Sequence, residues 1–242
     1  GGLGLIGSGS MKPNVLRTHI QKCRGATNNN FGVNIPLLFP YVSEHIDVII
    51  EEKVPIVFSS AGNPMKWTKK LKSNGIIVVH VISSLKFALK AVEAGVDAIV
   101  CEGFEAGGHN GRDETTTFCL IPLIKKYISK PIIAAGGVSS GKSMLAAMVL
   151  GADGVQIGSR FVTSEESSAH IDFKNQILSS KEGDTILTLK ELTPVRMIKN
   201  AFYSKIEEAY SNKVSITELT QLLGRGRAQN GMFLGDIDNG EL

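Results

Sequence analysis

The sequence contains little cysteine, little tryptophan and no long apolar run. Of its 242 residues one is Trp and three are Cys (Cys23, Cys101 and Cys119), and aromatic residues make up 6%. Three cysteines without the spacing of a metal site favour reduced thiols in a cytoplasmic protein. No apolar run approaches the roughly 18 residues that a transmembrane helix needs, and no signal peptide is visible. We therefore expect no membrane partner.

Charge is also unclustered. The formal net charge is +3, and the 26 basic residues are scattered along the chain without accompanying aromatic residues. A nucleic-acid surface needs basic residues gathered on one face, so no nucleic-acid partner is expected.

The first seven residues, GGLGLIG, have the glycine spacing of a dinucleotide-binding loop. That fingerprint needs a turn that opens a helix and an acidic residue about 20 positions later. Here the glycines lie inside a strand-like run, and no Asp or Glu precedes Glu44. We interpret them as glycines that allow close packing, or close approach of a ligand, on a strand.

Short apolar runs rich in Val and Ile alternate with helix-like segments. Such continuous runs are typical of parallel strands buried on both faces. The intervening helices have recognisable boundaries, with Ser84 and Ser140 at two starts and Gly95 and Gly151 at the matching ends. The expected strands are Leu3–Gly7, Asn30–Leu37, Pro55–Ser60, Ile76–Ile82, Ala98–Gly103, Pro131–Gly137 and Gly154–Ser159.

Seven consecutive strand–helix units predict an α/β fold, a TIM (β/α)8 barrel whose first strand is missing. An open doubly wound sheet is the alternative. So many similar units without a large break favour a sheet that closes into a barrel. We expect barrel units with the ligand site over residues 1–163. A helical extension packing on the barrel is expected over 164–242, with helices in Lys190–Ala209 and Ile216–Leu223. The strand-like start without Met suggests that the N-terminus lies upstream, and the C-terminus is expected to be cut as well.

The strand ends lack the residues of two common barrel chemistries. A Schiff-base aldolase needs a Lys there, and none of the runs contains one. A metal-dependent enolase-type site needs several acids, and Glu102 is the only charged residue in the runs. Neutral polar groups remain, which suit an organic cofactor that brings its own chemistry. They are Asn34, Ser59, Ser60, His80, Glu102, His109, Gln156 and Ser159; Asp97 and Asp153 begin strands at the opposite end and are expected to serve stability.

Two glycine-rich strand ends predict a phosphate site. PIIAAGG (131–137) and QIGS (156–159) end neighbouring strands in the last two units. Phosphates in barrels often bind to the loops after the last two strands, and glycines let backbone N–H groups point at an anion. Tight turns are the plainer explanation for each motif alone. The adjacent pair favours phosphate binding.

His109 lies in EGFEAGGHNG (102–111), just after a strand. As a metal ligand, His109 would lack a second histidine ligand, because His19, His45 and His170 fall in or beside expected helices. No metal is therefore predicted. Imidazole is close to neutral at physiological pH, which suits a lone acid–base group or hydrogen-bond donor above a cofactor. A loop histidine with only structural contacts is the alternative.

These stretches together carry a resemblance. GGLGLIG, FGVNIPL (31–37), EGFEAGGHNG, PIIAAGG and VQIGSRF (155–161) occur in order over nearly the whole chain and resemble the nitronate monooxygenase (2-nitropropane dioxygenase) family. That family includes the flavin-dependent enoyl-[acyl-carrier-protein] reductase II. SSAGNP (59–64), ESSAH (166–170) and TPVRMIKNAF (193–202) look closer to the reductase branch.

The resemblance implies a TIM barrel with noncovalently bound FMN and a role for each matching residue. His109 would be the catalytic histidine, and the others would contact the cofactor. The FMN contacts implied are Asn34, Glu102, Gly107, Gly136, Gly137, Gln156, Ile157, Gly158 and Ser159. Many nitronate monooxygenases have Gln in place of Glu102, and the family commonly has Thr in place of Ser159.

Three functions are compatible with these residues. The first is an NADH- or NADPH-dependent enoyl-[acyl-carrier-protein] reductase of fatty-acid biosynthesis, acting on a small-molecule or carrier-protein-bound enoyl thioester. The second is a nitronate monooxygenase that oxidises alkyl nitronates with oxygen and needs no nicotinamide. The third is a non-catalytic barrel that binds a phosphate ligand. The flanking stretches favour the reductase, and the resemblance is compatible with a homodimer.

Overall fold

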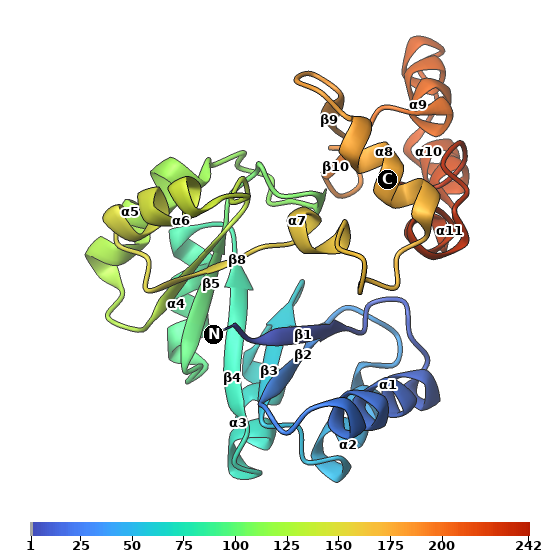
Figure 1. Cartoon of the computed structure of the whole chain (residues 1–242). Coiled ribbons are helices and arrows are strands. Elements are labelled where there is room, and N and C mark those ends of the chain that lie inside the picture. The colour runs from blue at the N-terminus through green and yellow to red at the C-terminus, as the bar shows by residue number, and fades with distance from the viewer. Residues whose placement is uncertain (1) are drawn as a thin grey trace.

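The computed structural model describes residues 2–242 and centres on a parallel sheet of seven strands. The sheet curls into a TIM-type barrel in which β1 and β8 form the two edges (Figure 1). Every strand expected from the apolar runs is present. The strands, in spatial order, are β1 (Gly4–Gly7), β2 (Phe31–Pro36), β3 (Ile56–Ser60), β4 (Ile77–Ile82), β5 (Ala98–Glu102), β7 (Ile132–Ala135) and β8 (Gly154–Gln156).

Six helices follow the strands and cover the outer face of the sheet (Figure 1). They are α1 (Pro13–Ala26), α2 (Val42–Glu51), α3 (Met65–Ser73), α4 (Leu85–Glu93), α5 (Thr117–Tyr127) and α6 (Gly141–Val149). The predicted caps are confirmed: Ser84 accepts from the N–H of Phe87, and Ser140 forms a capping box with Ser143. Gly95 and Gly151 follow the helix ends with φ of 83° and 112°, which favour glycine.

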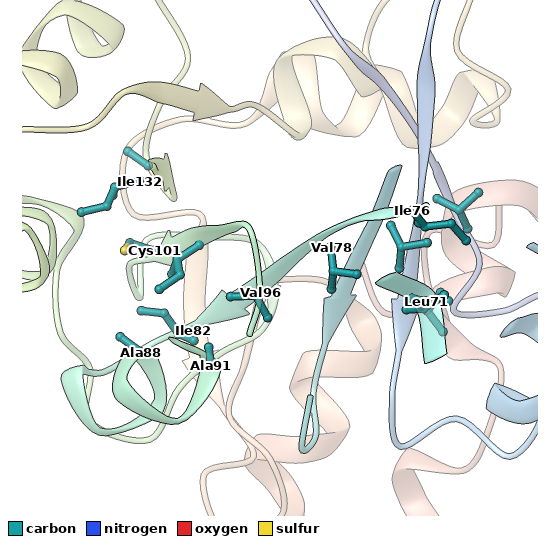
Figure 2. Close-up of a cluster of buried hydrophobic side chains, with 14 of the residues drawn as sticks. Leu71, Ile76, Val78, Ile82, Ala88, Ala91, Val96, Cys101 and Ile132 are labelled. Atoms are coloured by element: carbon teal, nitrogen blue, oxygen red, sulfur yellow. The ribbon is translucent and has the colours of Figure 1, made fainter. Parts of the chain in front are cut away.

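The main core lies between the sheet and these helices. It is built from one face of each strand and the inward faces of the helices, and part of it is shown in Figure 2. The labelled side chains there include Val78 and Ile82 of β4, Cys101 of β5, Ile132 of β7 and Ala88 and Ala91 of α4. The opposite, barrel-interior face of the sheet holds a smaller apolar cluster of Phe58, Val79, Val100 and Ala135. Both faces are therefore buried, as the continuous apolar runs predicted.

Asp97 and Asp153 fasten the amino ends of neighbouring strands. The carboxylate of Asp97 accepts from the N–H of Val78 at 2.9 Å, and that of Asp153 accepts from the N–H of Ile132 at 2.9 Å. Each carboxylate also pairs with a lysine, Lys72 and Lys125 respectively. The expected stability role of these two acids agrees with these contacts.

The chain after residue 163 combines helices with two strands, where sequence analysis expected helices alone. Its elements are α8 (Ile171–Ser179), β9 (Thr185–Thr188), β10 (Val195–Ile198), α9 (Ala201–Ser211), α10 (Ile216–Leu223) and α11 (Arg227–Leu234), and the short α7 (Ser159–Val162) precedes them. Figure 1 shows α8–α11 with β9 and β10 as one group beyond α7. The predicted helix over Ile216–Leu223 is confirmed.

The predicted helix over Lys190–Ala209 is wrong in its first half. β10 occupies Val195–Ile198 and pairs antiparallel with β9, and α9 begins only at Ala201. Pro194 biases the residue before it towards extended backbone. Asn200 accepts from the N–H of Tyr203 and caps the start of α9. Pairing with β9 and with the distant strand of residues 108–109 then decided the conformation of a segment whose composition also allows a helix.

A second apolar cluster holds this part of the chain together. It contains Leu189, Val195, Met197, Phe202, Ile206 and Leu219. Lys174 is also buried, and its Nζ donates to the carbonyl oxygens of Ser164 and Ser167, each at 2.7 Å. Within residues 2–242, no helix combines the length and apolar character that crossing a bilayer requires.

Candidate active site

Four polar side chains lie on the barrel-interior face at the carboxyl ends of the strands. Ser60 and Glu102 follow Phe58 and Val100 by two positions, so they share the interior face. Asn34 is in register with Phe58, and Gln156 is in register with Ala135, which places both on the same face. Asn34, Ser60, Glu102 and Gln156, all expected at this end of the barrel, therefore lie on its interior face.

Ser59 and His80 do not belong to this group, which corrects the expectation that they line the strand ends. They are in register with each other and alternate with interior residues, so both point to the helix-covered face. There the Ser59 hydroxyl lies 2.8 Å from Nδ1 of His80, and both side chains are buried. Burial lowers the pKa of His80 to about 4. His80 is thus a neutral core residue.

Glu102 is the only acidic side chain in this interior group. Its neighbours in the sheet are apolar, and burial raises its pKa from 4.5 to about 7. No hydrogen bond within the described residues uses its carboxylate. Such a carboxyl can exchange a proton near neutral pH, or donate or accept a hydrogen bond from a bound ligand.

The shifted carboxyl predicts a pH dependence of stability for the ligand-free protein. Since the pKa of Glu102 is higher folded than unfolded, the folded state binds more protons, and stability falls as pH rises from about 4.5 to about 7. The contribution is on the order of 3 kcal/mol. We expect the Glu102→Gln variant to lack this fall in stability when its free energy of unfolding is measured with urea at pH 5 and at pH 8. Glu93→Gln, an exposed control, should keep it; equal pH dependence in both variants would contradict the assignment.

Two amides of the interior group are incompletely bonded. The Nδ2 of Asn34 lies 3.3 Å from the carbonyl oxygen of Phe58 and 3.5 Å from the hydroxyl of Ser60, both long contacts. The Oε1 of Gln156 is buried and has no hydrogen-bond partner in the described residues. A buried acceptor without a partner is costly. A ligand that brings an N–H group to this face would satisfy it.

The glycine-rich ends of β7 and β8 are neighbours because these strands pair. Gly136 and Gly137 have φ of 95° and 71°. Among the backbone hydrogen bonds of residues 2–242, none is donated by the N–H of Gly136, Gly137, Gly158 or Ser159. A Cβ at Gly158 would meet nothing within 4 Å. These N–H groups are available to an anion, as the adjacent motifs predicted.

The turn after β7 is fixed by contacts with the start of α5. The Thr117 hydroxyl lies 3.1 Å from the carbonyl oxygen of Ala135 and 2.8 Å from that of Gly136. Glu105 accepts from the N–H of Thr117 at 2.9 Å. A Cβ on Gly136 would lie 2.7 Å from the carbonyl oxygen of Gly103. Glycine at 136 therefore allows both the left-handed backbone and the close approach of two strand ends.

His109 is not on a free loop: it forms the short strand β6 (Gly108–His109) with its neighbour. β6 pairs antiparallel with β10, with His109 opposite Val195, and the N–H of Asn110 donates to Pro194 at 2.8 Å. The His109 side chain is exposed. A Cβ on Gly107 would meet nothing within 4 Å, so the backbone before His109 also borders open space. Both residues can face a ligand.

Two arginines hold the segment between β5 and α5 against the rest of the chain. The Nε of Arg196 in β10 donates to the carbonyl oxygen of Phe104 at 2.9 Å, and its guanidinium lies over the Phe104 ring. Arg112 donates to the carbonyl oxygens of Lys190 and Leu192. Residues far apart in sequence thus fix the position of His109.

Sequence analysis missed these supporting residues. Arg112 and Arg196 have no motif that marks them, because their partners are backbone groups of distant segments. Asn110 bonds to the carbonyl oxygens of Ala106 and Gly108, while its own Oδ1 is buried without a partner. Only the strand-like pattern in VRMI (195–198) could have suggested that β6 has a pairing partner.

The arrangement combines a pair of turns with free backbone N–H groups, an interior row of amides with one acid, and an exposed imidazole on a fixed strand. In residues 2–242, no group of three or more His, Cys, Asp or Glu side chains could hold a metal ion. No Lys is present on the interior face at the strand ends. These groups can bind and orient a phosphate-bearing cofactor and move a proton beside it.

The nitronate monooxygenase family matches this chain over residues 1–242. A probable nitronate monooxygenase of Staphylococcus aureus strain MSSA476 is 34% identical over 268 residues, which is 93% of this chain and 72% of the relative. The same protein of strain Newman is 33% identical over the same shares.

Comparison with solved structures agrees. FabK from Thermotoga maritima is 41% identical, with a TM-score of 0.93 over 100% of this chain and 76% of its own. A nitroalkane oxidase from Streptomyces ansochromogenes has a TM-score of 0.76 and 24% identity over 84% of this chain and 71% of its own. That second likeness supports the fold alone.

Proposed function

The chain belongs to the nitronate monooxygenase family, and from this premise we propose that it is an FMN-dependent, NAD(P)H-dependent enoyl-[acyl-carrier-protein] reductase. The observation that carries the choice is the likeness to FabK, an enoyl-acyl-carrier-protein reductase II, at 41% identity over the whole chain. The curated relatives reach 34% over 93% of it. Identity at this level favours a shared substrate class, although fold alone does not fix function.

FMN fits the residues at the strand ends. The free N–H groups of Gly136, Gly137, Gly158 and Ser159, with the Ser159 hydroxyl, would bind its phosphate. Ile157 would pack beside them. The phosphate would thus lie at the ends of β7 and β8, as is common in barrels.

The ring of the cofactor would lie over the interior row. Asn34 and Gln156 have amide groups with unused hydrogen-bonding capacity, which a flavin ring can match. Gly107 leaves space for a planar ring beside the backbone. Glu102, whose pKa burial raises to about 7, can donate or accept a hydrogen bond there. The bound flavin supplies hydride transfer.

His109 would act on the substrate. Its exposed imidazole on β6 can donate a hydrogen bond to the thioester carbonyl, or supply a proton to the carbon next to it, while hydride reaches the β-carbon. The β6–β10 pairing fixes the backbone from which the imidazole projects. Positioning of this kind is what a protein contributes when the cofactor carries the chemistry.

Nitronate oxidation is the second candidate function, because the curated relatives are named probable nitronate monooxygenases. In that reaction His109 would bind or deprotonate the nitro compound. The two functions share the cofactor site and differ in the electron donor. The nicotinamide requirement therefore separates them better than any feature of the barrel.

The test is anaerobic mixing of the purified protein with NADH, NADPH or an alkyl nitronate while the flavin absorbance is followed. A reductase should bleach quickly with one of the nucleotides and recover its colour when an enoyl thioester is added. Bleaching by the nitronate but by neither nucleotide would overturn the reductase proposal and support the monooxygenase.

A further inference from the structure

The peptide unit between Gly136 and Gly137 lies in the turn after β7 and is flanked by glycine on both sides. The two residues have φ of 95° and 71°, and the bond between them is trans. Glycine populates more backbone conformations than any other residue, so the two residues themselves do little to orient this peptide plane. In a trans peptide the carbonyl oxygen and the N–H point in opposite directions. A group that holds the Gly136 carbonyl therefore also directs the N–H of Gly137.

The hydroxyl of Thr117 holds that carbonyl. It lies 2.8 Å from the carbonyl oxygen of Gly136, and no other hydrogen bond of residues 2–242 reaches this oxygen. Thr117 is buried, with 9% of its surface exposed. A Cβ on Gly136 would lie 3.0 Å from Oγ1 of Thr117, and a Cβ on Gly103 would lie 2.1 Å from it. The hydroxyl is thus fixed between the ends of β5 and β7.

The Thr117 hydroxyl has a single proton, and three acceptors lie around it. Besides the Gly136 carbonyl, these are the carbonyl oxygen of Ala135 and Oε2 of Glu105, each at 3.1 Å. Both have another donor. Ala135 accepts from the N–H of Gly103 at 2.9 Å, and Glu105 accepts from the N–H of Thr117 at 2.9 Å. Because the Gly136 contact is the shortest and its oxygen has no second donor, the hydroxyl proton is best placed there.

The orientation of this peptide decides what the turn presents to an anion. The N–H of Gly137 has no acceptor among the backbone hydrogen bonds of residues 2–242, so it is free to bind one. If the peptide flipped, its carbonyl oxygen would take the place of that N–H. An acceptor would then face the anion, and two acceptors in contact repel each other. The interior row of Asn34, Glu102 and Gln156 would be unaffected, because these side chains belong to the strands.

We propose that Thr117 is a positioning residue of the phosphate site: its hydroxyl holds the carbonyl of Gly136 and thereby directs the N–H of Gly137 at a bound phosphate. This inference rests on the phosphate site of the proposed function, and it names the residue that makes the site selective for a phosphorylated flavin. Riboflavin has the ring and the ribityl chain of FMN without the phosphate. Its binding should therefore not depend on Thr117.

The test compares Thr117→Ala with Thr117→Ser, because alanine and serine differ only in the hydroxyl. The purified protein, freed of flavin, is titrated with FMN and with riboflavin, and the dissociation constants are obtained from the quenching of flavin fluorescence. We expect Thr117→Ala to bind FMN more weakly than the wild type by about tenfold or more. Its affinity for riboflavin should stay unchanged. Thr117→Ser should keep the preference of the wild type for FMN.

Thr68→Ala is the matched control, because Thr68 is also buried and its hydroxyl donates to a carbonyl oxygen, that of Pro64 at 2.8 Å, in α3. It should keep the wild-type preference for FMN. If Thr117→Ala also keeps this preference, or loses affinity for both flavins equally, Thr117 does not position the phosphate site, and the proposed function still stands. A wild-type protein that binds riboflavin as tightly as FMN would instead overturn the phosphate site and this inference together.

Discussion

Replacement of His109 by Ala is expected to lower turnover by about 10²–10⁴-fold while flavin remains bound. A positioned acid–base group contributes a factor of this size. The β6–β10 pairing does not use the His109 side chain, so the substitution leaves the strand in place. The measurement is steady-state turnover with an enoyl thioester and with an alkyl nitronate, alongside the flavin content of the purified variant.

His19→Ala is the matched control, because His19 is exposed on α1, away from β6. It should retain wild-type turnover. His109→Ala with unchanged turnover on both substrates would remove the catalytic role proposed for this residue. Loss of flavin together with turnover would instead assign His109 to cofactor binding.

Replacement of Gly136 by Ala is expected to destabilise the protein and release the flavin. Its φ of 95° is rarely adopted by residues with a Cβ, and the added Cβ would lie 2.7 Å from the carbonyl oxygen of Gly103. Strain and overpacking of this kind cost about 3 kcal/mol. Displacing the turn also moves the N–H groups that would hold the phosphate. Urea unfolding and flavin content measure the two effects.

Gly154→Ala provides the control for that experiment. Gly154 begins β8, the strand next to β7, and a Cβ there would meet nothing within 4 Å. We expect its stability to stay within about 1 kcal/mol of the wild type and its flavin to remain bound. Equal behaviour of the two glycine variants would contradict the special role of residue 136.

The barrel could be predicted because its signals are local. Apolar runs, serine caps and glycine ends mark each unit within about 25 residues, and these boundaries agree with the structure. The helix predicted over Lys190–Ala209 was wrong because its first half pairs as a strand with the preceding β9 and with the distant β6. Long-range pairing leaves no periodic trace in so short a segment.

The residues of the candidate site also differ in whether local sequence signals could predict them. Glycines and polar residues that end strands were found from sequence, because strand ends in a parallel barrel share one rim. His80 was misplaced because a one-residue shift along a strand reverses the face, and the apolar run gave no sign of which face was interior.

At the level of family, the chain is an oxidoreductase whose relatives are flavin-dependent. Its architecture explains why the fold supports such chemistry with few charged groups. The barrel end has free backbone N–H groups and amides that the proposed cofactor would use, and the distant β10 completes the strand that carries His109. Under the proposed function, the cofactor would be bound by the strand ends of the barrel, while the later part of the chain fixes the position of His109.

The most direct test of the proposed site is the identity and amount of the cofactor in the purified protein. We predict one noncovalently bound FMN per chain, released by heat and identified by mass spectrometry, and its loss from Gly136→Ala but not from Gly154→Ala. A colourless wild-type protein that does not take up added FMN, or one that carries a different cofactor, would contradict the assignment of the strand ends to FMN.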